Sequence, residues 1–290
     1  MNRLSALLIA LAALAGLAPS AANAMMGDKA VAKMVSFGGS CERCELSGRQ
    51  LSGARFIGAD FTEAALVGSD LREARFHGSA FDRADLSRAD LSDSSMMGAS
   101  FAAANLSDAT VRGAEINGAD FGRANLSRAD LRGVEGSGSN FISANLTSAK
   151  LDEAELNAAN LARVNARGAS FRAAELTAAN LQGGRFDQAS FREAELDMAN
   201  LRGATFAGAD FRGASLDRTN LSGADLSHVR GLTQSQLDDA CADSGTRVPS
   251  GLVAKACGGR RIVVRPPAPP PPPPPPAPPA APRYLISQFD

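Results

Sequence analysis

Large apolar residues recur at every fifth position from Leu46 to Leu226. This phase contains 37 positions, of which 32 are Leu or Phe, and no Leu or Phe in the span lies off it. A small residue, most often Ala, stands two residues before each of these centres, as Ala84 and Ala124 do. A period of five fits neither the 3.6-residue period of a helix nor the two-residue period of a strand. The chain must therefore turn once in every unit.

A longer period of 20 residues is superimposed on the first. It is clearest in one column of centres: Phe61, Phe81, Phe101, Phe121, Phe141, Leu161, Leu181, Leu201 and Leu221. Four five-residue sides would make one square coil, with the large and small residues inward and the other three positions facing water. Coils of this kind would stack at the ~4.8 Å spacing of hydrogen-bonded strands. The same period predicts a second stack of Phe56 with Phe76. Late stacks are predicted for Phe171, Phe191 and Phe211, beside Phe186 and Phe206.

Units such as ADLSR, ANLSR and ADFRG resemble the pentapeptide-repeat family, whose pattern is a small residue, Asp or Asn, Leu or Phe, and two variable residues. The resemblance covers Leu46 to about Leu226 and implies a right-handed quadrilateral β-helix. We therefore predict an all-β solenoid with four repeats per coil, a short C-terminal helical cap and a disordered proline-rich tail. Gly136 and Ala166 are the two units that lack a large centre, and we expect the least inward volume there.

The chain divides into five segments. Residues 1–24 combine Arg3, an apolar run and the small triplet at Ala22 to Ala24, which is typical of a secretory signal. We predict cleavage after Ala24, a mature chain without a membrane span, and a periplasmic or secreted location. A lead-in and cap over 25–45, the repeats over 46–230, a second cap over 231–260 and the proline-rich tail over 261–290 complete the division.

Two exposed columns with the 20-residue period are candidate binding surfaces. Stacked glutamates repel one another, so we expect arginines three residues earlier to neutralise them in a solvated ridge of salt bridges. A strip that binds a protein or a cell-wall polymer is the alternative. The ridge comprises Arg112 with Glu115, Arg132 with Glu135, Asp152 with Glu155, Arg172 with Glu175, and Arg192 with Glu195. The second column, Asn140, Asn160, Asn180, Asn200 and Asn220, predicts a hydrogen-bonded amide ladder, with polysaccharide recognition as its alternative.

Charge and motif content disfavour several function classes. The whole chain has a formal net charge of -1, which provides no strong attraction to nucleic acid. Some members of the family mimic DNA and protect gyrase, but that requires a dense acidic surface and a cytosolic location. Catalysis lacks support, because His77 and His228 lie at opposite ends of the repeats and no phosphate-binding or nucleophile motif is present. No cofactor or metal is predicted.

The four cysteines lie beyond the two ends of the repeats. Cys41 and Cys44 precede the first unit, and Cys241 and Cys257 follow the last. Nine coils would hold these pairs about 40 Å apart, which excludes one zinc site made from all four. Two local disulfides are expected in an exported protein, with free thiols as the alternative. A redox-active CxxC is disfavoured because no thioredoxin-like unit surrounds Cys41 and Cys44.

The segments after the repeats predict a cap and a proline-rich tail that displays a short terminal peptide. Residues Thr233 to Ala242 predict a short helix in which Thr233 and Gln236 form a capping box and Leu237 and Ala240 share one face. We expect this helix to cover the last coil. The proline run over 266–282 predicts an extended polyproline II segment. The terminal peptide RYLISQFD is expected to be disordered alone and to order on a partner, or else to act only as a solubilising extension. Its candidate contact residues are Tyr284, Leu285, Ile286 and Phe289.

The sequence thus favours a non-catalytic binding or scaffolding module of the cell envelope, with an unidentified protein or envelope component as partner. A purely structural spacer is the first alternative, and a carbohydrate-acting β-helix enzyme is a more distant one. An enzyme would need loops inserted between coils to line a groove. The uninterrupted phase from Leu46 to Leu226 leaves no room for such loops.

Overall fold

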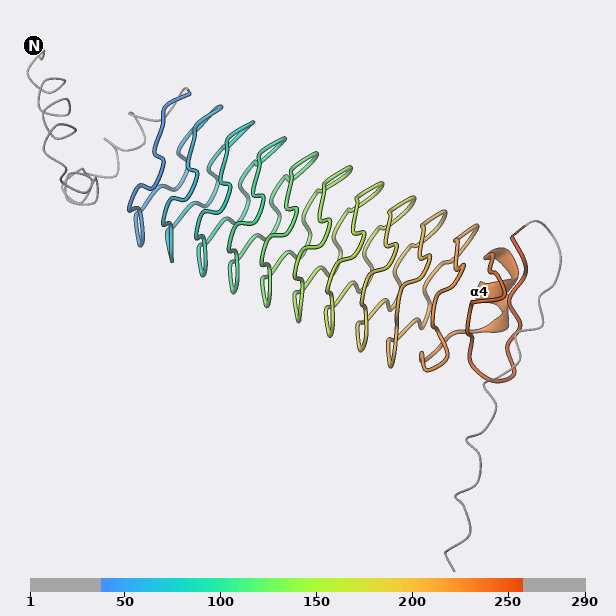
Figure 1. Ribbon diagram of the computed structural model, residues 1–290. Coiled ribbons are helices and arrows are strands. Elements are labelled where there is room, and N and C mark those ends of the chain that lie inside the picture. The colour runs from blue at the N-terminus through green and yellow to red at the C-terminus, as the bar shows by residue number, and fades with distance from the viewer. Residues whose placement is uncertain (1–37, 258–290) are drawn as a thin grey trace, which may run out of the picture.

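A computed structural model describes residues 38–257, which form one long solenoid with a small cap at its C-terminal end (Figure 1). The backbone makes isolated parallel bridges between residues 20 apart, such as Ser40 with Asp60 and Asn125 with Asn145. Each coil therefore contains four five-residue sides, as the sequence predicts. In one column the bridges run without a break from Ser40 to Cys241. These ten steps at ~4.8 Å give a rod about 48 Å long.

One repeat shows how the backbone polar groups are satisfied. The N–H of the centre Leu126 donates to the carbonyl of Asn145 in the next coil at 2.8 Å, and that of Arg128 donates to Thr147 at 2.9 Å. The N–H of Ala129 closes the corner by donating to the carbonyl of Leu126 at 3.1 Å. These bonds recur in nearly every unit, so the rod is held together by short contacts between neighbouring coils.

The corner of each unit requires a left-handed backbone conformation. The residue two after the centre has a positive φ, 59° at Arg128 and 63° at Gly133, as the third residue of a type II turn does. This conformation costs a non-glycine residue roughly 1–2 kcal/mol. The cost explains why glycine is frequent at this point of the repeat, and exposure to solvent explains why most of the other corners carry polar residues.

The Asp or Asn before each centre satisfies the one N–H that the backbone pattern leaves over. Asn125 Oδ1 accepts from the N–H of Ser127 at 3.2 Å, and Asp85 Oδ1 accepts from that of Ser87 at 2.9 Å. Where this position is not Asp or Asn, the preceding coil can supply the acceptor: Asp82 Oδ1 lies 3.2 Å from the N–H of Ala102. The same replacement occurs at Ser137, Thr177, Ala207 and Asp217, whose acceptors are Asn117, Asn157, Asp187 and Asp197. Hydrogen bonding of the turn thus explains why Asp or Asn is frequent before the centre of each repeat.

The predicted phenylalanine columns are confirmed. Rings stack nearly parallel from Phe61 to Phe141, with Phe81 and Phe101 4.9 Å apart, and Phe56 lies over Phe76. The late columns are Phe171, Phe191 and Phe211, and Phe186 with Phe206. At Gly136 the side chains of Ile116 and Leu156 lean inward and would lie 2.9 Å from an added Cβ. Neighbouring coils therefore fill the space that the missing side chain leaves.

The C-terminal end is closed by helix α4, Gln234–Asp239, which is the only helix in the described part of the chain (Figure 1). Thr233 caps its N-terminus in the predicted capping box, and Leu237 is fully buried against the last coil. Gln236 Nε2 donates to the terminal carbonyls of Phe211 at 2.9 Å and Ala214 at 2.7 Å. The helix therefore covers the end of the core and also occupies backbone acceptors that no further coil would reach.

Both predicted disulfides are present. Cys41 and Cys44 are bonded with 5.1 Å between their Cα atoms, and Cys241 and Cys257 with 4.7 Å. The second bond closes a loop with a sequence separation of 16 and ties the end of the cap to the residue that bridges Asn220. Within residues 38–257, no group of three or more Cys, His, Asp or Glu side chains is placed to hold a metal ion.

Several predictions concern residues outside the described range. The signal peptide, most of the N-terminal lead-in, the proline-rich tail and the terminal peptide lie in 1–37 and 258–290. Inside the described range, no helix is long and apolar enough to span a membrane.

Candidate binding faces

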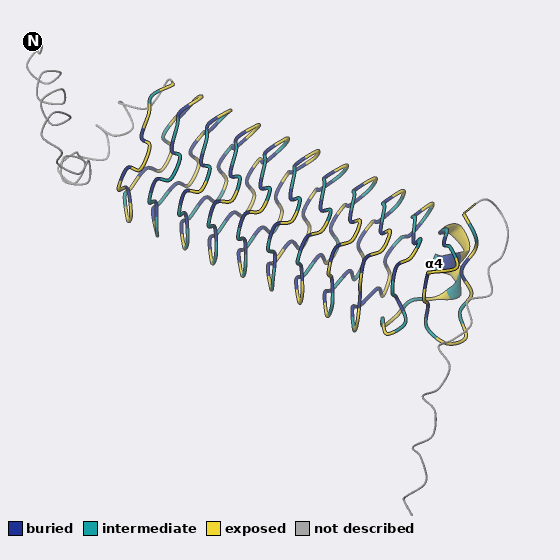
Figure 2. Cartoon of the chain, viewed as in Figure 1, coloured by how far each residue is buried: buried dark blue, intermediate teal, exposed yellow. Residues whose placement is uncertain are grey.

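Each side of the rod presents one outward column of residues. The residue before each centre lies in the middle of a side, and the residue after each centre lies at the following corner. Figure 2 shows how buried and exposed positions alternate along every coil. Side chains at the corner reach back onto the side before it: Asp82 bonds the hydroxyl of Ser100, and Asp152 bonds that of Ser170.

The Glu column consists of Glu115, Glu135, Glu155, Glu175 and Glu195. Parallel bridges join each of these residues to the next, and all five are exposed. Their only side-chain hydrogen bond within residues 38–257 is from Asn157 Nδ2 to Glu175 Oε2, at 3.0 Å. The column therefore presents five carboxylates in register over about 19 Å, the length of four steps.

The expectation that the arginine column neutralises these glutamates is wrong. Arg112 and Arg132 both pair with Asp130, at 2.7 and 2.8 Å. Arg172 lies 3.9 Å from Glu193, outside the column, and the buried Nε of Arg192 has no hydrogen-bond partner. The reason is geometric: an arginine at the corner reaches back to the preceding side, whereas the glutamate three residues later lies on the following side.

The side that carries the Glu column bears positive instead of negative charge toward the N-terminus. Arg55 and Arg75 continue the Glu column, and neither has an ion pair within 4 Å in the described part of the chain. Ser95 separates them from Glu115, and its hydroxyl lies 2.7 Å from His77 Nε2. A hollow of about 320 Å³ lies here, lined by Glu73, Arg75, His77, Asp93, Ser95 and Glu115. Sequence inspection missed this hollow, because corner side chains had to be placed before it became visible.

The predicted asparagine ladder is present in part. Asn180 Nδ2 donates to Asn160 Oδ1 at 3.2 Å, and Asn200 Nδ2 donates to Asn180 Oδ1 at 3.3 Å. The first amide, Asn140, donates to the carboxylate of Asp120 at 2.7 Å. A second ladder, which the sequence analysis missed, joins Asn105, Asn125, Asn145 and Asn165 and begins on Asp85. The 20-residue spacing of these four asparagines could have predicted this second ladder from the sequence.

A family model for pentapeptide repeats matches eight copies that together span residues 40–230. The chain belongs to the pentapeptide-repeat family. A search of curated proteins finds no match.

The solved structure of HetL agrees with this membership. HetL, a pentapeptide-repeat protein involved in heterocyst differentiation regulation from the cyanobacterium Nostoc sp. strain PCC 7120, is 28% identical with a TM-score of 0.65. That match covers 78% of this chain and 98% of HetL. QnrB1, a plasmid-mediated fluoroquinolone resistance protein, is 22% identical over 71% of this chain and 94% of its own, with a TM-score of 0.35. Together, the family match and HetL support the right-handed quadrilateral β-helix that the resemblance implied.

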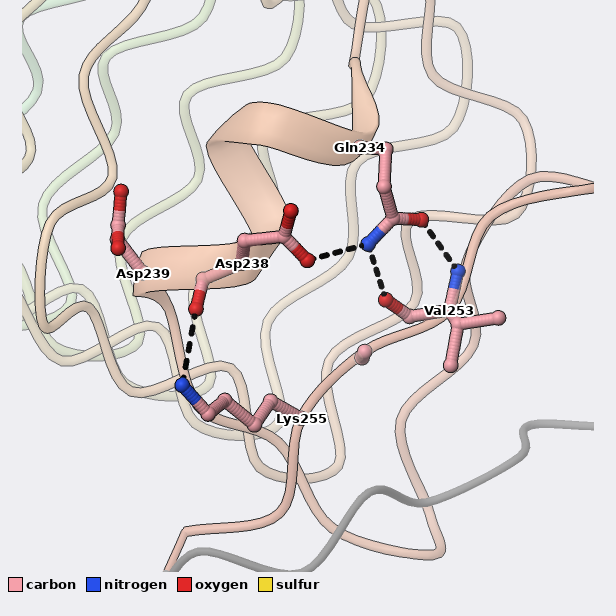
Figure 3. A pocket seen from close by; sticks show the side chains of 6 residues that line it. Gln234, Asp238, Asp239, Val253 and Lys255 are labelled. Carbon is pink, nitrogen blue, oxygen red and sulfur yellow. Dashed lines mark hydrogen bonds between the residues drawn. The ribbon is translucent and has the colours of Figure 1, made fainter.

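A hollow with a volume of about 550 Å³ lies in the cap of this pentapeptide-repeat protein (Figure 3). Gln234 pairs with the backbone of Val253 through both amide atoms, at 2.9 and 3.0 Å, and also donates to Asp238 Oδ1 at 2.8 Å. Lys255 Nζ donates to the carbonyl of Asp238 at 3.4 Å. Because these groups satisfy one another, the contacts serve to hold the last described segment against α4.

One buried carboxylate, Asp210, should make the stability of the protein depend on pH. Asp210 is 4% exposed, and Arg212 Nε donates to its Oδ1 at 2.9 Å. The hydrogen bonds from the Arg212 guanidinium hold the pKa of Asp210 at about 2, against the opposing effect of burial. Since the pKa is lowered on folding, this stabilisation is complete above the ordinary Asp pKa of about 4 and is lost as the pH falls toward 2.

We therefore expect Asp210→Asn to lower the melting temperature at pH 7, and the difference from wild type to shrink between about pH 4 and pH 2. Thermal unfolding followed by circular dichroism at several pH values would measure this. The control is Asp93→Asn, which changes an exposed carboxylate without an ion pair in the described part of the chain and should leave stability unchanged. A difference for Asp210→Asn that stays constant down to pH 2 would contradict the assignment.

Proposed function

We propose that this protein is an exported, non-catalytic binding or scaffolding module of the cell envelope, and that the Glu column contacts a cationic partner. The supporting observation is the register of five exposed carboxylates, none within 4 Å of a cationic side chain among residues 38–257. Solenoids use extended surfaces of this kind to bind partners, because each repeat adds the same group at a constant spacing.

Electrostatics provides the physical reason. Two unit charges 4 Å apart in water interact by about 1 kcal/mol, so stacked carboxylates repel appreciably unless a cation lies among them. A partner with several positive groups would relieve this repulsion and gain attraction at the same time. Binding of this kind weakens as salt is added, because salt screens exposed charges beyond about 10 Å at 0.1 M.

The test compares two variants with equal charge changes. Glu135→Gln with Glu155→Gln removes two charges from the Glu column, and Glu73→Gln with Glu193→Gln removes two exposed charges outside it. Each protein is immobilised and exposed to envelope extract at increasing salt. We expect the column variant to lose the salt-sensitive partner that wild type and the control variant both retain.

Other outcomes would favour the alternatives. If all three proteins retained the salt-sensitive partner equally, a role for the Glu column would be contradicted. Absence of any specific partner would favour the structural spacer. Release of new reducing ends from envelope polysaccharide would indicate the carbohydrate-acting enzyme. Export is tested separately: the N-terminal sequence of protein from the envelope fraction should begin at Met25, and retention of residues 1–24 would contradict cleavage.

A further inference from the structure

We propose that the proline-rich segment, residues 266–282, docks in cis along the Asn face of the rod. The Asn face is the side that carries the predicted asparagine column and its following corner. It comprises Asn140, Asn160, Asn180, Asn200 and Asn220 with Ile142, Ala162, Gln182, Arg202 and Ser222. The inference concerns a different side from the Glu column and does not depend on the function proposed above.

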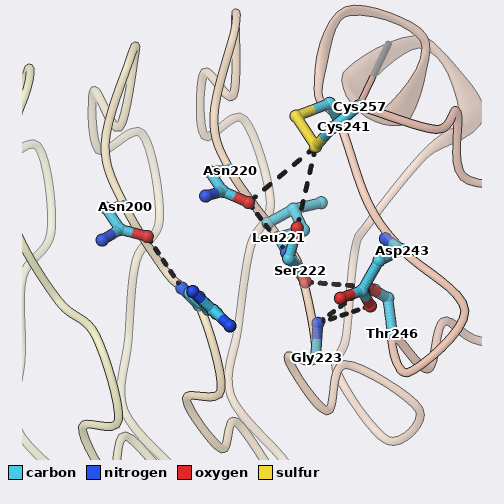
Figure 4. The surroundings of a disulfide bond; sticks show 10 residues. Asn200, Asn220, Leu221, Ser222, Gly223, Cys241, Asp243, Thr246 and Cys257 are labelled. Carbon is cyan, nitrogen blue, oxygen red and sulfur yellow. Dashed lines mark hydrogen bonds between the residues drawn. A yellow bond between two sulfur atoms is a disulfide. The ribbon is translucent and has the colours of Figure 1, made fainter. Parts of the chain in front are cut away.

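The first argument is where the tail begins. Cys257, the last described residue, is bonded to Cys241, which forms the backbone bridge to Asn220. Cys257 Sγ lies 3.7 Å from Ser222 Oγ and 3.9 Å from Asn220 Oδ1 (Figure 4). The disulfide therefore starts the tail at the C-terminal end of the Asn face.

The second argument is length and register. From Asn220 to Asn140 the face spans four bridges, or about 19 Å. Seventeen residues of polyproline II at ~3.1 Å each reach about 53 Å, which is enough to follow the whole face. One polyproline II turn of three residues rises about 9.3 Å, and two coils rise about 9.6 Å. The segment can therefore repeat its contacts on every second coil with little accumulated mismatch.

The third argument is chemical complementarity. Proline has no N–H, so the segment offers a carbonyl acceptor at every residue and N–H donors only at its four alanines. Each asparagine amide has two donor hydrogens, and the ladder uses no more than one of them, as at Asn180 and Asn200. The adjacent corner provides apolar contact at Ile142 and Ala162. Between Asn140 and Gln182 the defined face carries no charge, which suits an uncharged ligand.

A tether makes such docking effective even when each contact is weak. A flexible linker holds its ligand at an effective concentration in the millimolar range, so little affinity is needed for the segment to occupy the face. The Asn face would then be covered by its own chain until a partner for the face or for the tail competes. This would make the tail a built-in competitor for any ligand of the Asn face.

The experiment uses the full chain and its single tyrosine. The chain has no Trp, so the fluorescence of Tyr284 reports on the tail alone. Time-resolved anisotropy should show Tyr284 tumbling with the rod when the segment is docked, and a fast component when it is free. Ala162→Glu places a charge on the Asn face. Residue 162 directly follows a centre, and other units carry Arg, Asp or Gln at this position of the repeat. Ala207→Glu makes the same change at the equivalent position of another side.

We expect Ala162→Glu to lower the ratio of docked to free tail by at least about tenfold. Ala207→Glu should match wild type, and the free 17-residue peptide PPAPPPPPPPPAPPAAP in excess should release the tail of wild type. A fast anisotropy decay of Tyr284 in wild type would overturn the inference. A slow anisotropy decay that neither Ala162→Glu nor the peptide changes would overturn it as well. Slow tumbling that disappears on dilution would overturn docking in cis, because it would indicate a second copy.

Discussion

Leu126→Asp is expected to abolish cooperative folding of the central coils. Leu126 is fully buried in the middle of the rod, between inward side chains of the neighbouring coils. An aspartate there would have no partner in the core, and an uncompensated buried charge costs roughly 3–5 kcal/mol. Because each coil is stabilised mainly by its neighbours, the damage should spread to adjacent coils before it reaches the ends.

Circular dichroism and limited proteolysis would measure this effect. We expect a broadened thermal transition at a lower temperature, and cleavage near the substituted coil. Ser127→Asp is the matched control, because residue 127 follows at the corner, is partly exposed, and corresponds to positions where other units carry Asp. A single sharp transition for Leu126→Asp near that of wild type would contradict the buried position of this side chain.

Phe101→Ala is expected to destabilise the rod by about 3–5 kcal/mol. Phe101 is fully buried in the centre of a stack of five rings, 4.9 Å from Phe81 and 5.0 Å from Phe121. Its loss removes contacts with two rings and leaves a cavity between coils whose spacing is set by backbone hydrogen bonds. The coils cannot close the cavity without breaking those bonds, so little relaxation is possible.

Chemical denaturation of wild type, Phe101→Ala and Phe101→Leu would test this estimate. The leucine variant should lose much less stability, because Leu occupies the equivalent position in later coils, as at Leu161. If Phe101→Leu were as damaging as Phe101→Ala, ring stacking rather than filled volume would be the main contribution of the column.

The repeat phase made most of the fold predictable. A side-chain period of five with a longer period of 20 determines which residues lie inward and which stack, so the phenylalanine columns and the square coil were both available from the sequence. The capping box at Thr233 and the pairing of the cysteines also followed from local spacing. All of these depend on distances of a few residues or on an unbroken period.

The partners of the exposed side chains were not predictable in the same way. Arg112 is three residues from Glu115 in sequence but pairs with Asp130 in the next coil. The direction in which a corner side chain projects depends on the φ of the turn, and no residue count reveals it. The hollow beside His77 and the replacement acceptor at Asp82 depend on the same geometry.

By itself, the sequence determined the coil, its register and its core, because the five-residue period and the longer 20-residue period set which residues lie inward and which stack on one another. Only the tertiary structure decided which surface charges are neutralised, because many of the ion pairs join side chains 18 or 20 residues apart in neighbouring coils. It left the Glu column without cationic partners among the described residues, and it placed Cys257 beside Asn220 at the end of the Asn face. Both candidate binding faces therefore follow from how neighbouring coils align.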